Sequence, residues 1–243
     1  MTKEFTLIYG DTRIPYRVVD DPARATRVAI HVDPDGSVTV DAPVGFADEA
    51  IQKAVQKRAR WITTHVSDAN HRHAQVRARE YVSGEQVLYL GRRYVLKVVA
   101  TNHPTKLVRL RGNKLEIQSR TGSVDEIRGL VRGWYRTKAR DYFAQRLDHL
   151  SEVLPWIKEV PPFRLLQMSS QWGSCAPTGQ IILNPHLVKA PRQCVDYVIV
   201  HELAHHRHHD HSPEFFRLLD TTVPDWQSHK RVLDGMVEVV MND

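Results

Sequence analysis

The segment His201-Glu202-Leu203-Ala204-His205 places two imidazoles and a carboxylate at a spacing that suits metal chemistry. On an α-helix, four residues advance about 6 Å along the axis and about 40° around it, so His201 and His205 point the same way. Glu202 is about 100° round the helix, where it can reach a metal-bound water without binding the ion. The pattern predicts a zinc ion (Zn²⁺) held by the two histidines, with Glu202 as the catalytic base.

A catalytic zinc ion takes three protein ligands and keeps one position for water, so a third ligand is expected nearby. On a straight helix His209 would lie about 12 Å from His201 along the axis, too far to share an ion at zinc–nitrogen distances of about 2.1 Å. The helix must therefore end and the chain must turn back. Ser212-Pro213-Glu214 supplies a new helix start, with serine as cap and proline in the first turn. His211, just before that start, is the predicted third metal ligand, and a downstream Asp or Glu is the alternative.

The other histidines of this run, His206, His208 and His209, are expected at the surface or beside the ligands. Upstream of the motif, the chain divides into two kinds of segment. Residues 4–42 and 81–117 contain short β-rich runs separated by turn signals, and residues 47–66 carry apolar side chains at helical spacing. A hairpin is expected at 28–42, with Asp33-Pro34-Asp35-Gly36 as its turn.

The second half of the chain is mostly helical. A long helix is expected to begin after Ser123, which forms a capping box with Glu126, and to end before Pro155. Short strands at 163–170 and 180–183 follow, and then the buried metal helix. We therefore predict an α+β fold, with a β-rich N-terminal region at 1–120 that contains one or two helices, and a helix-rich metallohydrolase domain at 121–243. We find no internal repeat in the sequence.

Composition narrows the class of protein. The 243 residues include two cysteines, too few for a disulfide framework, and no apolar run long enough for a signal peptide or a membrane span. We expect a soluble, cytoplasmic protein without membrane contact. The net charge of +6 suits anionic partners, but the basic residues are spread along the chain and are partly offset by 28 acidic residues.

Five segments together resemble the YgjP-like metal-dependent hydrolases, the DUF45 group: 171–175, 179–184, 196–205, 211–216 and 224–226. That group is similar to the SprT-like and M48-type zinc metallopeptidases. The resemblance implies a zincin-like C-terminal domain with His201, His205 and His211 as zinc ligands and Glu202 as base. Members commonly carry Arg where this chain has Gln171, and Trp-Arg where it has Pro185-His186. Specificity is expected to differ wherever those positions contact substrate.

Two features near the motif have two interpretations each. Trp172, Ser174 and Cys175 either line a substrate cleft or pack structurally, and we favour packing because buried cysteines are usually inert. The strand at 181–183 either binds an extended peptide at its edge or belongs to the core.

Three functions are consistent with the sequence. The first is a zinc metallopeptidase acting on a peptide or protein substrate. The second is a metal-dependent hydrolase of nucleotides or other phosphoanhydrides, although the chain has no Gly-rich phosphate loop, and the cations that bind phosphate prefer oxygen ligands. The third is a DNA-associated protein-processing module, by analogy with SprT-like proteins, although no basic stripe for nucleic acid is evident. The sequence does not define the oligomeric state.

Overall fold

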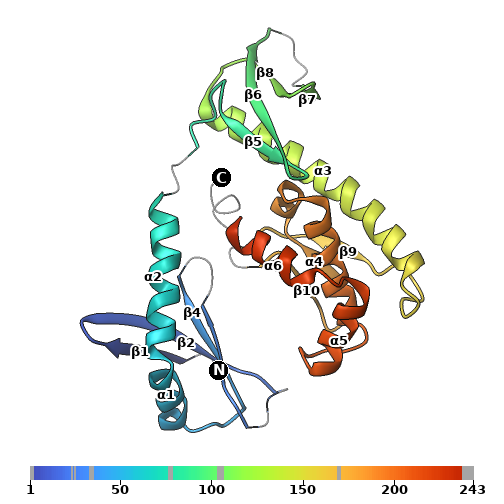
Figure 1. The fold of residues 1–243 in the computed structure, drawn as a ribbon. Helices are drawn as coiled ribbons and strands as arrows, with labels where there is room; N and C mark the ends of the chain where they lie inside the picture. The colour runs from blue at the N-terminus through green and yellow to red at the C-terminus, as the bar shows by residue number, and fades with distance from the viewer. Residues whose placement is uncertain are drawn as a thin grey trace. The chain divides into compact units, whose positions relative to one another are not determined.

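The structure is a computed structural model in which strands and helices are mixed along the chain, as the predicted α+β class requires (Figure 1). It describes residues 3–22, 24, 26–32, 36–75, 79–102, 107–168 and 171–236, with 71–75 as backbone only. The chain divides into two compact units, Met1–Arg77 and Ala78–Asp243. Each unit has a hydrophobic core of its own.

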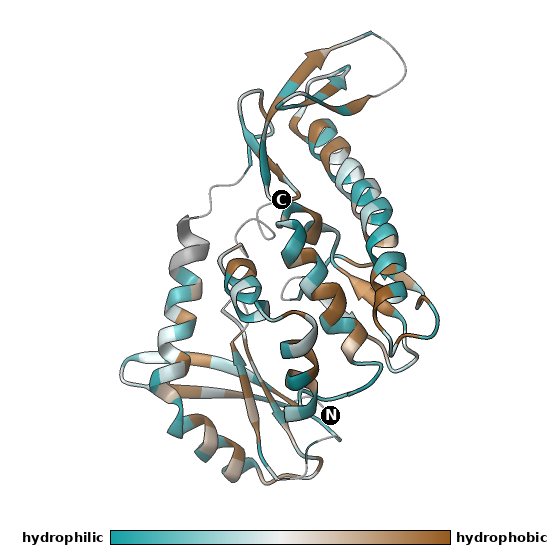
Figure 2. Cartoon of the chain, turned by 45° about the vertical axis from the view of Figure 1, so that its right-hand side comes forward, coloured by the Kyte–Doolittle hydropathy of each residue, from teal (hydrophilic) through white to brown (hydrophobic). Residues whose placement is uncertain are grey.

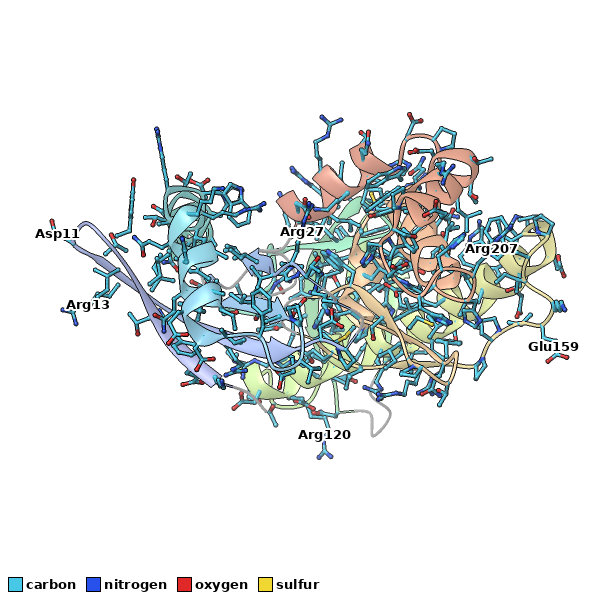
Figure 3. All side chains as sticks on the ribbon, turned by 90° about the horizontal axis from the view of Figure 1, so that it is seen from below. Asp11, Arg13, Arg27, Arg120, Glu159 and Arg207 are labelled. Carbon is cyan, nitrogen blue, oxygen red and sulfur yellow. The ribbon has the colours of Figure 1, made fainter. Side chains whose placement is uncertain are left out.

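The first unit packs one face of a four-stranded sheet against two helices. Its strands lie in the order β1 (Lys3–Tyr9), β2 (Thr12–Asp20), β4 (Val38–Ala42), β3 (Ala29–Val32), and its helices are α1 (Asp48–Lys57) and α2 (Ala59–Gln75). Ile14, Tyr16 and Val18 are buried while the residues between them are exposed, because successive side chains of a strand point to opposite faces. Asp11 and Arg13 lie at the outer end of the β1–β2 hairpin (Figure 3).

Two predictions for this unit have different outcomes. Strands β3 and β4 pair antiparallel, which confirms the hairpin, while residues 33–35 of its turn lie outside the described residues. The helical spacing at 47–66 belongs to two helices, within the one or two predicted for this region, because the chain bends at Arg58, between α1 and α2. The bend allows Val55 and Ile62, on either side of it, to bury in the same core. Helical periodicity continues across such a bend and does not reveal it.

The second unit builds another sheet, a long helix and the metal-motif helix around one core. Its elements are β5 (Gln86–Tyr89), β6 (Arg92–Ala100), β7 (Val108–Arg111), β8 (Lys114–Ser119), α3 (Val124–Val153), β9 (Phe163–Leu165), β10 (Gly173–Cys175), β11 (Ile181–Leu183), the 3₁₀-helix η1 (Pro185–Lys189), α4 (Arg192–Ala204), α5 (Pro213–Thr222) and α6 (Trp226–Gly235). Strands β5 to β8 form one sheet, and β9 to β11 form a separate three-stranded sheet.

Helix α3 begins where the sequence predicts, but only half of the predicted capping box forms, since the Ser123 N–H donates to the Thr121 hydroxyl oxygen at 3.1 Å and not to Glu126. The Ser123 hydroxyl accepts a hydrogen bond from the backbone N–H of Glu126, as an N-cap does. The carboxylate of Glu126 accepts from the Ser119 and Thr121 hydroxyls, both at 2.6 Å, and so ties the helix start to the end of β8. Hydrophilic and hydrophobic residues are interspersed along this helix (Figure 2). No helix in the described part of the chain is both long and apolar enough to cross a membrane.

The boundary between the two compact units falls between residues 77 and 78 of the chain, whereas the sequence predicts a domain boundary between residues 120 and 121. The sheet β5–β8 belongs with the helices because it shares their core: Leu96 and Leu115 lie in one buried cluster with residues of α3 and α4. Polar contacts tie the same elements together. The Tyr135 hydroxyl donates to the Leu88 carbonyl at 2.6 Å, and the Leu90 N–H donates to the Val188 carbonyl of η1 at 2.8 Å. A change from β-rich to helix-rich composition therefore does not mark the edge of a unit.

The two units share the same strand order and strand directions, although no internal repeat is visible in the sequence alone. The orders β1-β2-β4-β3 and β5-β6-β8-β7 match, each with two antiparallel hairpins joined by a central parallel pair and followed by a helix. Faint identities occur at constant spacings: Tyr9, Arg13, Val18 and Val19 match Tyr89, Arg93, Val98 and Val99, while Gly45, Asp48 and Glu49 match Gly122, Asp125 and Glu126. Both glycines have positive φ, 75° and 67°. Seven such matches in a chain of this length are visible only once the strands are aligned.

Candidate metal centre

Helix α4 carries the metal motif inside the core of the second unit. Nine of its residues are buried, among them Val198, Ile199 and Leu203, so the helix is fixed by packing along most of its length. The Arg146 guanidinium of α3 binds the Asp196 carboxylate of α4 through two hydrogen bonds of 2.7 and 3.2 Å. A two-point contact of this kind fixes the orientation of both helices as well as their separation.

The three predicted ligands come together at the end of α4. His201, His205 and His211 each offer a ring nitrogen, and these atoms lie within 4.8 Å of one another. The Nε2 atoms of His201 and His211 are 3.0 Å apart. Two nitrogens bound to one tetrahedral zinc ion would be about 3.3 Å apart, given zinc–nitrogen bonds of about 2.0–2.1 Å. The arrangement therefore fits a single ion with small adjustment.

The turn that returns His211 to the helix is made without glycine. Helix α4 ends at Ala204, and the N–H groups of Arg207 and His208 both donate to the Ala204 carbonyl at 3.0 Å. No residue described between His205 and His211 has a positive φ. Helix α5 then starts as the sequence predicts, with Ser212 as cap, accepting from the Phe215 N–H, and proline at the first position. The side chains of His206 and His209 are exposed, as expected.

The packing beneath the three imidazoles adds a residue that the sequence analysis missed. The fully buried ring of Phe215 lies 4.8 to 4.9 Å from the ring centres of His201, His205 and His211. The His205 Nδ1 atom is 3.2 Å from the His208 carbonyl, so Nδ1–H donates there and Nε2 is left to bind a cation. In the sequence, the one indication that Phe215 packs against the histidines is its place as the third residue of α5, close after His211.

Glu202 is buried beside the triad in contact with the glycine of β10. Its side chain and backbone together are 5% exposed, and this burial raises the pKa of its carboxyl to about 8. A Cβ atom on Gly173 would lie 2.8 Å from Glu202 Oε1 and 2.9 Å from its Cγ. Glycine is therefore required at this position for the carboxyl to stand where it does. No sequence pattern links two residues so far apart in the chain.

His201 and His205 both have a lowered pKa, which favours the neutral imidazole that binds metals. Burial, followed by the neighbouring His211, His205 and Lys230, lowers the pKa of His201 to about 3. Burial also lowers the pKa of His205, although hydrogen bonds to backbone carbonyls partly oppose the effect. The surroundings of His201 and His205 thus disfavour a proton on these two candidate ligands.

The triad opens into a cleft of about 1060 Å³. The cleft is lined by the segment 171–179 and by residues of α4 and α6, including Tyr197 and Lys230. Trp172, Ser174 and Cys175 all line this cleft, and Trp172 also packs against the core, so the two interpretations of this loop apply together. Gln171 lines the cleft as well, whereas Pro185 and His186 are buried in η1.

The edge-binding interpretation of residues 181–183 is wrong. Strand β11 lies between β10 and β9, paired on both sides, and Ile181 and Leu183 are fully buried. The strand at the edge of this sheet, next to the cleft, is β10, for which the sequence gave no strand signal. Of the described strands, only β11 pairs with β10.

Asn184 is a second residue whose role was not foreseen. Its amide nitrogen donates to the Met168 and Gln171 carbonyls at 2.8 and 3.0 Å, while its amide oxygen accepts from the His186 N–H. The residue is fully buried. It therefore holds the carbonyls of Met168 and Gln171 beside the cleft wall, and a lone asparagine in the sequence gave no sign of this role.

Comparison with known proteins identifies a family. The protein-family model that describes the YgjP-like metallopeptidase domain matches residues 26–236. This range includes every residue of the triad and the cleft wall. No curated protein and no solved structure matches the chain.

Proposed function

Because the chain belongs to the YgjP-like family of metallopeptidase domains, we propose that it is a zinc-dependent peptidase. In this proposal His201, His205 and His211 hold the ion, and Glu202 is the catalytic base. One observation carries it: three imidazole nitrogens lie within 4.8 Å of one another, beside a buried carboxyl, at the floor of an open cleft.

The choice of zinc rests on the donor set. Three neutral imidazoles suit zinc and other late transition metals, whereas Mg²⁺ and Ca²⁺ prefer oxygen ligands. Three ligands leave one coordination position open, as in catalytic zinc sites. A zinc ion bound there would supply a water of near-neutral pKa and polarise a substrate carbonyl.

The protein side of the reaction then falls to Glu202. Its carboxylate accepts the proton of the attacking water and delivers it to the leaving nitrogen. Gly173 leaves the space that the Glu202 carboxyl occupies, because the side chain of any larger residue at 173 would overlap it. His205 keeps its Nε2 directed at the ion through the hydrogen bond of Nδ1 to the His208 carbonyl.

An extended peptide is the substrate that best suits the cleft. The edge strand β10, Gly173–Cys175, lines it, and the backbone of an edge strand can pair with an added strand. Such pairing would place a scissile peptide bond beside Glu202, which touches Gly173. Phosphoanhydride hydrolysis and DNA-associated processing have no comparable structural support.

The test compares Glu202→Gln with the wild type in metal content and in cleavage of a broad peptide library. We expect one equivalent of zinc in both proteins and a loss of cleavage by about 10²–10⁴-fold in the variant, since the base is removed and its size is kept. His211→Ala should lose zinc, whereas His208→Ala, which keeps the backbone carbonyl that His205 uses, should retain it.

Two results would reject the proposal. Cleavage by Glu202→Gln at the wild-type rate would remove the base from the mechanism. Release of pyrophosphate from nucleoside triphosphates by the zinc-loaded wild type, in the absence of any peptide cleavage, would favour the phosphoanhydride alternative instead.

A further inference from the structure

Tyr197 of α4 lines the cleft, yet the proposed function gives it no role. It stands one helical turn before His201, so that Tyr197, His201 and His205 lie on the same face of the helix. The residue as a whole is only 6% exposed. Nearly all of its ring is therefore buried, and a small part of the side chain remains in contact with the cleft.

The hydroxyl of Tyr197 is the part that reaches the cleft. Among the residues that the structure describes, no group forms a hydrogen bond with this hydroxyl. The hydroxyl oxygen is also not one of the fully enclosed polar atoms that lack a partner. Since it is neither bonded nor enclosed, it opens into the cleft, where a ligand can accept its hydrogen bond.

Three aromatic neighbours hold the Tyr197 ring in this position. Its centre is 5.9 Å from that of His201, in an edge-on arrangement, and 6.2 Å from that of Trp226, in a stacked arrangement. The His229 ring of α6 lies 6.5 Å away. Trp226 is itself fixed, because its indole N–H donates to the Asp220 carboxylate at 2.7 Å. The hydroxyl is thus presented to the cleft by a ring with little freedom to turn away.

Packing does not account for this hydroxyl. A phenylalanine would make the same ring contacts, and taking a hydroxyl out of water without a partner costs free energy. Lys230, another polar residue that lines the cleft, already pairs with the Asp234 carboxylate at 2.7 Å. Outside the metal triad, Tyr197 is therefore the donor without a partner among the described cleft residues of α4 and α6. A phenol keeps its proton at neutral pH and can donate it to a carbonyl oxygen.

The position of Tyr197 suits an extended peptide. In such a chain the carbonyls that point to one side recur every two residues, about 6.4–6.8 Å apart. The ring centres of Tyr197 and His201 are 5.9 Å apart, which is a similar distance. A peptide that runs along α4 with its scissile carbonyl beside His201 can therefore bring the carbonyl two residues away to the Tyr197 hydroxyl.

We propose that Tyr197 is a substrate-binding residue, whose hydroxyl donates a hydrogen bond to the peptide carbonyl two residues from the scissile one. The inference rests on the proposed function, because it requires a peptide in the cleft. It implies that a good substrate extends at least two residues from the cleavage site on the side that faces Tyr197.

The test compares Tyr197→Phe with the wild type on the best-cleaved peptide of the library that tests the proposed function. We expect equal zinc content, a KM raised about three- to tenfold and a kcat within about twofold, because one neutral hydrogen bond is lost from the bound ground state and transition state alike. The variant should melt at no lower temperature, since no hydrogen bond within the protein is lost.

Tyr135→Phe is the matched control. Its hydroxyl donates to the Leu88 carbonyl at 2.6 Å, and the residue lies outside the cleft. This variant should therefore melt at a lower temperature and keep the wild-type KM, the opposite of the result expected for Tyr197→Phe.

Binding without turnover is measured by calorimetry with three hydroxamates, whose hydroxamate group chelates zinc, on the zinc-loaded protein. Acetohydroxamate has no peptide carbonyl. The other two carry a trialanine chain, on the amino side of the hydroxamate in one and on the carboxyl side in the other. Tyr197→Phe should bind acetohydroxamate as the wild type does, and one of the longer compounds about three- to tenfold more weakly. The compound that responds gives the direction of the substrate along α4.

An unchanged KM for Tyr197→Phe, or equal affinity of the two proteins for both longer hydroxamates, would overturn this inference and leave the proposed function intact. A lower melting temperature with an unchanged KM would assign the hydroxyl a structural role instead. If the wild type cleaves no peptide of the library, the proposed function itself fails, and this inference fails with it.

Discussion

Zinc binding by this chain is expected to release a proton from Glu202, although Glu202 is not one of the ligands. Burial raises the pKa of this carboxyl to about 8 in the metal-free protein. At pH 7 about 0.9 of the molecules therefore carry a proton on Glu202. A nearby divalent cation favours the carboxylate by several kcal/mol, because one unit charge at about 4 Å already contributes about 4 kcal/mol at an effective dielectric constant of ~20. The proton should leave when zinc binds.

Isothermal titration calorimetry measures this release. Zinc is titrated into the metal-free protein at one pH in buffers of different ionisation enthalpy, and the slope of the observed enthalpy gives the number of protons released. The wild type should release about 0.9 proton more than Glu202→Gln at pH 7, and only about 0.1 more at pH 9. His201 adds almost nothing, because its pKa of about 3 leaves it neutral in this range. The comparison cancels protons from any other group.

Equal slopes for the two proteins at pH 7 would refute the reasoning. They would mean that the Glu202 carboxyl is already ionised without metal, and that its burial against Gly173 does not raise its pKa. A difference that persists unchanged at pH 9 would also contradict it, since a group of pKa about 8 is then mostly deprotonated before zinc arrives.

Three further predictions concern stability and positioning. Without metal, the free energy of unfolding should fall by roughly 3–5 kcal/mol as pH rises from about 4.5 to about 8, because the raised pKa of Glu202 favours the protonated, folded form at low pH; Glu202→Gln should flatten this part of a urea-denaturation series. Gly173→Ala should retain zinc but lower kcat by about 10²-fold, since its Cβ displaces the Glu202 carboxyl, whereas Gly129→Ala, with open space around it, should retain full activity in the same peptide assay. Ser212→Ala removes the cap of α5 and should destabilise the protein by about 1 kcal/mol in thermal unfolding; an unchanged melting temperature would show that the cap does not hold the segment that carries His211.

The sequence alone located the residues of the candidate metal centre. His201, Glu202 and His205 are close in the chain, and the 3.6-residue period of a helix fixes which of them share a face. His211 could be predicted as the third ligand because Ser212 and Pro213 indicate the start of a helix. Such a start is also a signal carried by a few consecutive residues. The starts of α3 and α5 were predictable for the same reason.

Tertiary structure decided whatever depends on residues distant in the chain. It placed Gly173 against Glu202, set Phe215 beneath three imidazoles, and put β10 at the edge of its sheet with β11 in the middle. It also joined β5–β8 to the helices in one core and exposed the repeat of topology between the units. Sheet order and core membership arise from packing between segments far apart in sequence, and neither periodicity nor capping signals carry that information, since both are properties of a few consecutive residues.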